Sequence, residues 1–329
     1  MLRRFVDILR SDWVWRYLVG PLPFAVMLAA LAQHRFTFEH AVLPSAMAVM
    51  YFTPKTKRVY PYLFPFFFFW VTYDTLRVAT PIFHSIIPPQ VAWPYNLELA
   101  LFGIPTGAGR ITLNEFFATH THPALDLVCA FAYAFYFYEP FLFAFWLLAK
   151  NRPVLRRYGV AFILCNYMGF VTYYLLPAAP PWYVELYGLG PAVMSTPASA
   201  ARLLAVDAYF HISYFHDLYA RSANVFGALP SLHAAFPLLV WLASRVSIRN
   251  RAVRVAMVAY WLLVVFSAVY LRHHYVIDVT LGSIYAFTSW VIVNRIADRW
   301  DATAEDHANE HAAKSDAEQL TKQPGEQTA

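Results

Sequence analysis

The chain of 329 residues is 59% hydrophobic and 18% aromatic, and only 14% of its residues are charged. Soluble domains carry about 25% charged residues, so this composition excludes an ordinary soluble protein and indicates a polytopic membrane protein. The net charge of +5 is unevenly distributed: seven acids and two lysines after Trp300 give that end a charge of −5, and the rest of the chain carries +10. A basic body suits loops that face anionic lipid headgroups rather than nucleic acid.

The N-terminal region, residues 1–58, is predicted to hold an amphipathic basic segment and two apolar spans. The first span covers about residues 17–32, and its Ala-Leu-Ala end is also compatible with a cleaved signal peptide. The second is short, contains a proline and covers about residues 41–53. We expect this region to precede the catalytic part of the chain.

Residues 59–298 are predicted to form the membrane-embedded core. A very aromatic third span ends at about Thr72 and is followed by the polar YDTLR, and residues 78–123 are rich in proline and glycine and are expected to form loops. Five further spans are predicted at about 125–149, 158–176, 231–247, 255–271 and 275–295. Their lengths suit a bilayer core, which makes the fold an all-α integral membrane bundle of about eight transmembrane helices with a six-helix catalytic core.

Residues 299–329 have few large apolar side chains and are predicted to form a disordered, acidic, cytoplasmic tail. Cys129 and Cys165 both lie in apolar runs, so we interpret them as packing residues.

Basic residues concentrate in every second connection, which predicts the orientation. They are Arg3, Arg4 and Arg10, then Lys55, Lys57 and Arg58, then Lys150, Arg152, Arg156 and Arg157, and finally Arg245, Arg249, Arg251 and Arg254. By the positive-inside rule these connections and both termini face the cytoplasm. The loops at 78–123, 177–230 and about 272–274 then share the outer face, which is periplasmic if the host is bacterial and luminal if it is a eukaryote.

The stretch VYLRHHYVIDVTLG holds a candidate nucleophile. His274 and Asp278 stand four residues apart, so on a helix their side chains share a face. The aspartate can then hold one imidazole nitrogen and fix the tautomer, which leaves the other nitrogen as a nucleophile. Taken alone, the pair is equally well explained as a structural anchor at a helix end.

The stretch NVFGALPSLHAAFPLLVW predicts a helix that starts in its Pro-Ser-Leu-His turn, with Ser231 as the cap. Unpaired amides at a helix start bind phosphate, and His233 in the same turn can protonate a departing alkoxide. Taken alone, His233 is also explained as an interfacial histidine exposed to water.

Together, PSLHAAF and HHYVID, with their histidines 41 positions apart, resemble the two signature blocks of the type-2 phosphatidic acid phosphatase superfamily. Leu232, the doubled His273-His274, PAAPPWY (177–183) and ELALFGIPT (98–106) look similar to its inositol phosphorylceramide synthase branch. The resemblance covers about residues 70–290.

The resemblance implies phosphoryl transfer between lipids without a metal or another cofactor. His274 would attack the phosphorus and form a phosphohistidine, Asp278 would orient and stabilise it, and His233 would protonate the leaving oxygen and then deprotonate the acceptor. The implied reaction moves a phospho-headgroup, such as inositol phosphate, from a phospholipid donor to a lipid hydroxyl such as that of ceramide. No obligate protein partner is inferred.

Two other functions remain open from the sequence. The same residues would serve a lipid phosphate phosphatase that hydrolyses phosphatidic acid or a polyprenyl phosphate or pyrophosphate. A transporter or scaffold is a more distant alternative, against which the lack of an internal repeat counts.

The phosphate-binding cations of the wider superfamily are missing here. No Lys-x6-Arg-Pro block precedes the Ser-His block, and Ala268 stands six residues before His274, where an arginine is expected. Arg272 and Arg77 are the candidates to replace them, and snorkelling or structural pairing explains each arginine about equally well.

Further candidate substrate-binding residues are Ser231, His273 and Trp182, the last either at the mouth of the site or in a rigid interfacial turn. His120 and His122 in THTHP have no third ligand nearby, so we expect no metal site there.

Overall fold

The computed structural model describes residues 38–107, 109–220, 222 and 224–321, and within this range the side chains of several helical positions, including 74–79 and 300–321, are left undescribed. The predicted amphipathic segment and the first span at 17–32 lie outside these residues. The bundle consists of α4 (Phe38–Phe52), α6 (Tyr60–Ile86), α9 (Pro123–Phe135), α10 (Glu139–Lys150), α11 (Arg152–Leu175), α15 (Leu232–Ser247), α16 (Arg251–Tyr270) and α17 (Val276–Thr321).

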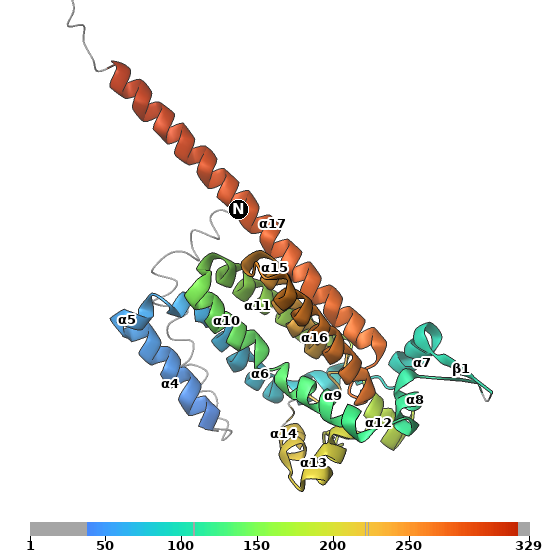
Figure 1. Cartoon of the computed structure of the whole chain (residues 1–329). Coiled ribbons are helices and arrows are strands. Elements are labelled where there is room, and N and C mark those ends of the chain that lie inside the picture. The colour runs from blue at the N-terminus through green and yellow to red at the C-terminus, as the bar shows by residue number, and fades with distance from the viewer. Residues whose placement is uncertain (1–37, 108, 221, 223, 322–329) are drawn as a thin grey trace, which may run out of the picture.

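The connections carry shorter elements. These are α5 (Pro54–Lys57), α7 (Ala92–Phe102), β1 (Ile104–Thr106), β2 (Gly109–Ile111), α8 (Leu113–Thr119), α12 (Pro181–Tyr187), the 3-10 turn η2 (Ala201–Leu203), α13 (Leu204–Phe210) and α14 (Tyr214–Ala220). The strands β1 and β2 pair antiparallel, with Ile104 opposite Ile111. Figure 1 shows most of these elements gathered at one end of the bundle.

The helical character agrees with the predicted all-α membrane fold, although the count of about eight spans is not reproduced. Within the described residues, three helices are long and apolar enough to cross a membrane, namely α11, α16 and the Val276–Arg299 part of α17. The bent pair of α9 and α10 makes a fourth if it is taken as one span.

Three boundaries differ from the sequence prediction. The span expected at 125–149 is broken into α9 and α10, which meet at an angle of 49°, and Pro140 near the start of α10 explains why the helix does not run through. The helix α6 continues through the polar YDTLR as far as Ile86. The helix α17 continues to Thr321 where a disordered tail was expected, because its alanines, glutamates and lysine favour helix.

Aromatic side chains pack α6, α11 and α15 together. The ring of Phe162 lies 5.2 Å from that of Phe69 and 5.0 Å from that of Phe236. Such pairs contribute about 0.5–1.5 kcal/mol beyond simple burial. Cys129 and Cys165 are buried and free, which confirms their reading as packing residues.

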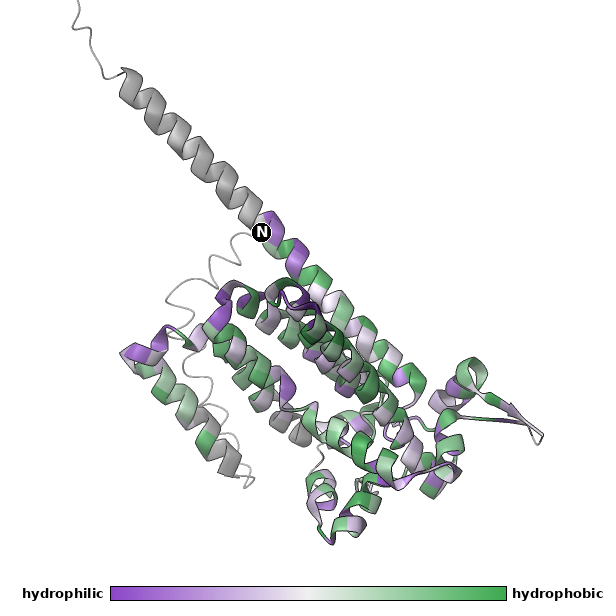
Figure 2. Ribbon diagram, viewed as in Figure 1, coloured by the Kyte–Doolittle hydropathy of each residue, from purple (hydrophilic) through white to green (hydrophobic). Residues whose placement is uncertain are grey.

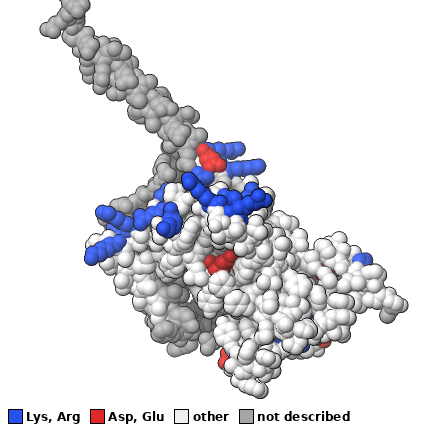
Figure 3. Space-filling model, in the orientation of Figure 1, with Lys and Arg blue, Asp and Glu red and all other residues white. Residues whose placement is uncertain are grey.

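The outside of the bundle is apolar, whereas most of its lysines and arginines lie at one end. Large side chains on the flanks are exposed, including Phe131, Leu262 and Phe287. Figure 2 shows the hydrophobic flanks, and Figure 3 shows lysines and arginines gathered at the end opposite α7, α8 and α12. The 20 residues of α16 separate the basic 245–254 connection from the 271–275 turn by about 30 Å.

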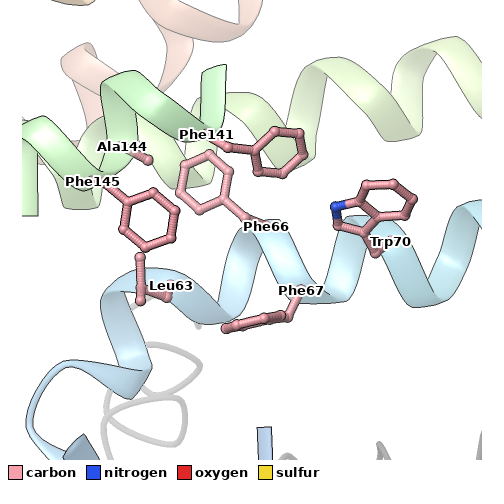
Figure 4. Close-up of a pocket in the computed structure, with 7 residues that line it drawn as sticks. All are labelled: Leu63, Phe66, Phe67, Trp70, Phe141, Ala144 and Phe145. Atoms are coloured by element: carbon pink, nitrogen blue, oxygen red, sulfur yellow. The ribbon is translucent and has the colours of Figure 1, made fainter. Parts of the chain in front are cut away.

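A small hollow lies between α6 and α10. It has a volume of about 70 Å³, and Figure 4 shows aromatic and aliphatic side chains around it. The lining residues are Leu63, Phe66, Phe67, Trp70, Phe141, Ala144 and Phe145. Because none of them is titratable, this hollow suits hydrocarbon and is excluded as the place of catalysis.

The starts of α15 and α17 touch at a glycine. A Cβ on Gly282 would lie 2.0 Å from the carbonyl oxygen of Ser231, which is a backbone atom that cannot swing away. The backbone N–H of Ser231 in turn donates to the carbonyl oxygen of Asp278 at 2.9 Å. This contact fixes the two helix starts against each other.

We therefore expect Gly282→Ala to force the two helix starts apart. The loss in stability should be at least about 1–3 kcal/mol, the usual cost of overpacking. Thermal unfolding of the purified protein in detergent measures the effect. Gly190→Ala is the matched control, since a Cβ there meets nothing within 4 Å, and equal melting temperatures for the two variants would contradict the prediction.

Candidate active site

The turn between α16 and α17 carries the candidate nucleophile. The backbone N–H groups of His273 and His274 both donate to the carbonyl oxygen of Ala268, at 3.1 Å each. The side-chain amide of Asn114 on α8 donates to the carbonyl oxygens of Val269 and His274, at 2.9 Å each. These bonds hold the turn from both sides.

His274 and His233 meet directly. The Nε2 atom of His274 lies 2.9 Å from Nδ1 of His233, while Nδ1 of His274 lies 2.9 Å from the carbonyl oxygen of Ala228. A carbonyl oxygen only accepts, so the geometry assigns the proton of His274 to Nδ1 and leaves a lone pair on Nε2. Nδ1 of His233 then donates to that lone pair.

Asp278 stands behind the nucleophile, although His274 itself precedes α17. The predicted sharing of one helix face is therefore not the reason for their proximity, because α17 begins at Val276. The turn brings Oδ2 of Asp278 to 3.5 Å from Nδ1 of His274, and the same oxygen accepts the backbone N–H of Tyr275 at 2.8 Å. Oδ2 of Asp278 therefore lies close to the Nδ1 side of the imidazole, opposite the Nε2 atom that faces His233.

Ser231 occupies the predicted cap position of α15 without capping it. Its side chain makes no cap hydrogen bond, and its Oγ is buried with no partner among the described residues. Oδ1 of Asp278 is likewise buried and unpaired within that part of the chain. A buried polar atom without a partner costs about 1–3 kcal/mol, so these atoms are available to a bound polar group.

Tyrosine rings pack against the rings of His233 and His273. The ring of His233 is stacked on Tyr133 at 4.4 Å and lies 4.3 Å from Tyr136. The ring of His273 is sandwiched between Tyr133 at 5.2 Å and Tyr219 at 4.6 Å. Burial, followed by the nearby His274, lowers the pKa of His273 to about 3.

Glu98 anchors the start of α17 from a distant part of the sequence. Its two carboxylate oxygens accept the backbone N–H groups of Val276 and Ile277, at 3.1 and 3.0 Å. The side chain is fully buried, and this burial raises its pKa although the two hydrogen bonds oppose the shift. Glu98 therefore positions the helix that carries Asp278.

The two candidate arginines differ in what the structure describes. Arg272 adopts a left-handed backbone with φ of 66° and pairs its guanidinium with Glu185, which is on α12. Arg77 lies within α6, and its side chain is among those not described. The phosphate-binding role of both arginines stays a prediction.

Trp182 lies in a buried cluster beside the site. It packs with Val91, Ala179 and Phe226, and its backbone N–H donates to the carbonyl oxygen of Arg272 at 3.1 Å. The PAAPPWY stretch thus directly supports the 271–275 turn, which carries the candidate nucleophile and is called the catalytic turn below. Any contact of the Trp182 ring with a substrate stays a prediction.

His120 and His122 are occupied locally. The ring of His120 stacks on Phe116, and Nδ1 of His122 accepts the backbone N–H of Ala124 at the start of α9. No group of three or more potential metal ligands occurs among the described residues.

Sequence reasoning missed several residues that build this site. The likeness of ELALFGIPT to the synthase branch assigned no role to Glu98. The sequence also led to no prediction for Asn114, Tyr133 and Tyr219. The signal for Glu98 was available, because a carboxylate inside an apolar run needs a partner. The tyrosines gave no comparable signal in a chain with 22 of them.

Comparison with known proteins identifies similar enzymes. The sequence profile of the PAP2 superfamily matches residues 110–292. A phosphoinositol dihydroceramide synthase from Bacteroides thetaiotaomicron is 34% identical over 256 residues, which is 77% of this chain and 83% of that protein. An inositol phosphorylceramide synthase catalytic subunit from Schizosaccharomyces pombe is 28% identical over 87% of this chain and 66% of its own length.

An inositol phosphorylceramide synthase from Candida albicans is 28% identical over 74% of this chain and 50% of its own length. The chain thus spans most of the bacterial relative and between half and two thirds of these fungal ones. No solved structure matches the chain.

We expect Glu98→Gln to loosen the start of α17. The amide has a single acceptor oxygen, so one of the two backbone N–H groups loses its partner, at a cost of roughly 1–3 kcal/mol. Thermal unfolding in detergent measures the loss. Glu115→Gln, on the more exposed α8 surface, is the control and should lose less. Equal losses would rule out the anchoring role.

The depressed pKa of His273 predicts acid lability. The folded state keeps this imidazole neutral down to about pH 3, whereas the unfolded chain takes up a proton near its ordinary pKa of 6.5. The associated stability is complete above pH 6.5 and is lost as the pH falls towards 3, by about 2 kcal/mol at pH 5.

His273→Phe keeps the aromatic stack without the titration. Its melting temperature should therefore fall less between pH 7.5 and pH 5 than that of the wild type. The same fall in both proteins would show that another group causes the acid sensitivity.

Proposed function

Since the chain belongs to the PAP2 superfamily, we propose that it is a lipid phosphotransferase that moves inositol phosphate from a phospholipid to the hydroxyl of a ceramide-type lipid. Its membership and its synthase relatives make it a membrane enzyme of lipid metabolism. The histidine mechanism rests on one observation, the contact of His274 Nε2 with His233 Nδ1 at 2.9 Å. The donor and acceptor are proposed from the synthase relatives.

In the first step, the lone pair on Nε2 of His274 forms a bond to phosphorus. The bond from phosphorus to the diacylglycerol oxygen breaks, and its electron pair stays on that oxygen. In the substrate complex His233 is protonated on both ring nitrogens; its Nδ1 supplies the proton that the oxygen needs, and His233 becomes a neutral imidazole. Diacylglycerol leaves, and inositol phosphate remains on His274.

In the second step, the acceptor's hydroxyl oxygen attacks the same phosphorus and the nitrogen–phosphorus bond returns its electrons to Nε2. The hydroxyl proton passes to Nδ1 of His233, which restores the starting state. Throughout, Asp278 and the Ala228 carbonyl oxygen stabilise the proton on Nδ1 of His274.

The resting geometry is closed. Two nitrogens 2.9 Å apart leave no room for phosphorus between them, so substrate binding must part the rings. Ser231 Oγ, buried and unpaired within the described chain, would then meet a phosphoryl oxygen. The guanidinium of Arg272, together with that of Arg77, would supply positive charge.

The same proposal includes an orientation. The basic connections lie at one end of the bundle, and α7, α8 and α12 lie at the other (Figures 1 and 3). The turn that carries His274 bonds to Asn114 of α8 and Trp182 of α12, and His274 contacts His233, so the site belongs to this second end. We propose that the basic end and both termini face the cytoplasm and that the site faces outward, which is the periplasm of a bacterial inner membrane. About eight spans result when residues 17–32, α4, α6 and α15 are counted with the others.

Radiolabelled lipids test the reaction. Purified protein in liposomes should convert inositol-labelled phosphatidylinositol to a new labelled lipid only when ceramide is present. His274→Ala should abolish this product, and His233→Asn should lower its rate by about 10²–10⁴-fold through loss of the proton donor. Quenching wild type in alkaline denaturant without an acceptor should trap label on the protein, and acid should release it, because a phosphohistidine is labile in acid.

Release of free inositol phosphate regardless of acceptor, or of phosphate from phosphatidic acid, would identify a hydrolase instead. Equal rates in wild type and His274→Ala would overturn the histidine mechanism. Asn151→Ala, at the opposite end of the bundle, serves as a control for the effect of mutation itself.

A further inference from the structure

A second, larger cavity opens beside the catalytic turn. It has a volume of about 340 Å³ and lies between the last turns of α6 and the segment that leads into α15. Its lining residues are Thr80, Pro81, His84, Ser85, Met194, Ser222, Asn224, Val225 and Phe226. None of them belongs to the histidine cluster or to its tyrosine enclosure.

His84 is the unusual residue in this lining. Its side chain is only 4% exposed, and both ring nitrogens lack a hydrogen-bond partner among the described residues. The hydroxyls around it are already engaged: Thr80 with Tyr174, Ser85 with the carbonyl oxygen of Ile82, and Ser222 with that of Asn224. An imidazole buried without partners is costly unless a ligand supplies them.

The walls indicate what kind of ligand fits. Pro81, Met194, Val225 and Phe226 are apolar, and among the lining residues only the His84 ring has fully buried polar atoms without a partner in the described part of the chain. An inositol ring would bring many hydroxyls into a place that cannot satisfy them. A single polar linkage flanked by hydrocarbon suits the cavity better.

The cavity is joined to the reaction centre by a short stretch of backbone. Phe226 lines the cavity, and two residues later the carbonyl oxygen of Ala228 contacts His274. Two residues span at most about 7 Å. A lipid whose hydroxyl reaches the phosphorus can therefore place its nearby linkage in the cavity.

We propose that this cavity binds the polar linkage of the acceptor lipid and that His84 selects an amide over an ester; this rests on the proposed transfer function. A neutral imidazole offers one donor and one acceptor. The two ring nitrogens point away from each other, so one amide pairs with only one of them. The amide N–H can donate to the unprotonated nitrogen, whereas an ester has no donor and leaves that ring lone pair buried and unpaired.

The selection has a chemical purpose. Diacylglycerol leaves in the first step and carries a free hydroxyl of its own, so it competes with the ceramide-type acceptor for the phosphohistidine. A site that disfavours esters prevents diacylglycerol from returning and reversing the step. Sites built to hydrogen-bond a substrate group discriminate strongly against analogues that lack it.

The test compares dihydroceramide with diacylglycerol as acceptors for labelled phosphatidylinositol in liposomes, where transfer to diacylglycerol is seen as exchange of label. In His84→Phe, the ratio of kcat/KM for dihydroceramide over diacylglycerol should fall roughly 10–100-fold. The KM for phosphatidylinositol should stay unchanged. His84→Gln, which keeps a donor and an acceptor, should retain most of the selectivity, and His120→Phe, outside the cavity, should retain all of it.

A binding measurement separates this proposal from the reaction. Dihydroceramide with a fluorescent acyl chain is titrated into protein in nanodiscs without donor lipid, and His84→Phe should weaken binding roughly 10-fold or more. Unchanged binding, an unchanged acceptor ratio, or a raised KM for phosphatidylinositol alone would overturn the role of His84. If wild type binds dihydroceramide through His84 yet transfers nothing to it, the proposed function fails while the binding site stands.

Discussion

The backbone hydrogen bond from Ser231 to Asp278 is the constraint on which the site depends. It joins the first residue ahead of α15 to the first turn of α17 at 2.9 Å. Gly282 permits this approach, because any side chain there would strike the Ser231 carbonyl group. The meeting of the two histidine rings, 41 positions apart in sequence, follows from this backbone contact rather than from attraction between the side chains.

The catalytic turn is supported from outside the two signature blocks. Asn114 holds its carbonyl oxygens and Glu98 holds the amides that follow it. Both residues come from the connection between α6 and α9, which sequence analysis expected to be loop. That connection therefore acts as a scaffold for this end of the bundle. One buried polar residue of α7, Glu98, and one of α8, Asn114, bond to the backbone in and beside the turn.

The meeting of the candidate site residues was easier to predict than the architecture. Short motifs contain His233, His274 and Asp278 directly, and hydropathy marked most of the long helices within a few residues. The break between α9 and α10, the length of α6 and the roles of Glu98 and Tyr133 depend on tertiary contacts that a linear pattern does not contain. His84 was passed over for the same reason, since a lone histidine near a helix end gains meaning only when its cavity is known.

The separation of the basic end from the histidine end has a consequence for the membrane as a whole. An enzyme whose reacting atoms lie near one surface draws donor and acceptor from a single leaflet and deposits its product there. Under the proposed transfer and orientation, the chemistry is also a source of lipid asymmetry, because a lipid with a polyol phosphate headgroup does not cross the bilayer unaided. The supply of donor to that leaflet, through a separate translocation step, then becomes a determinant of flux.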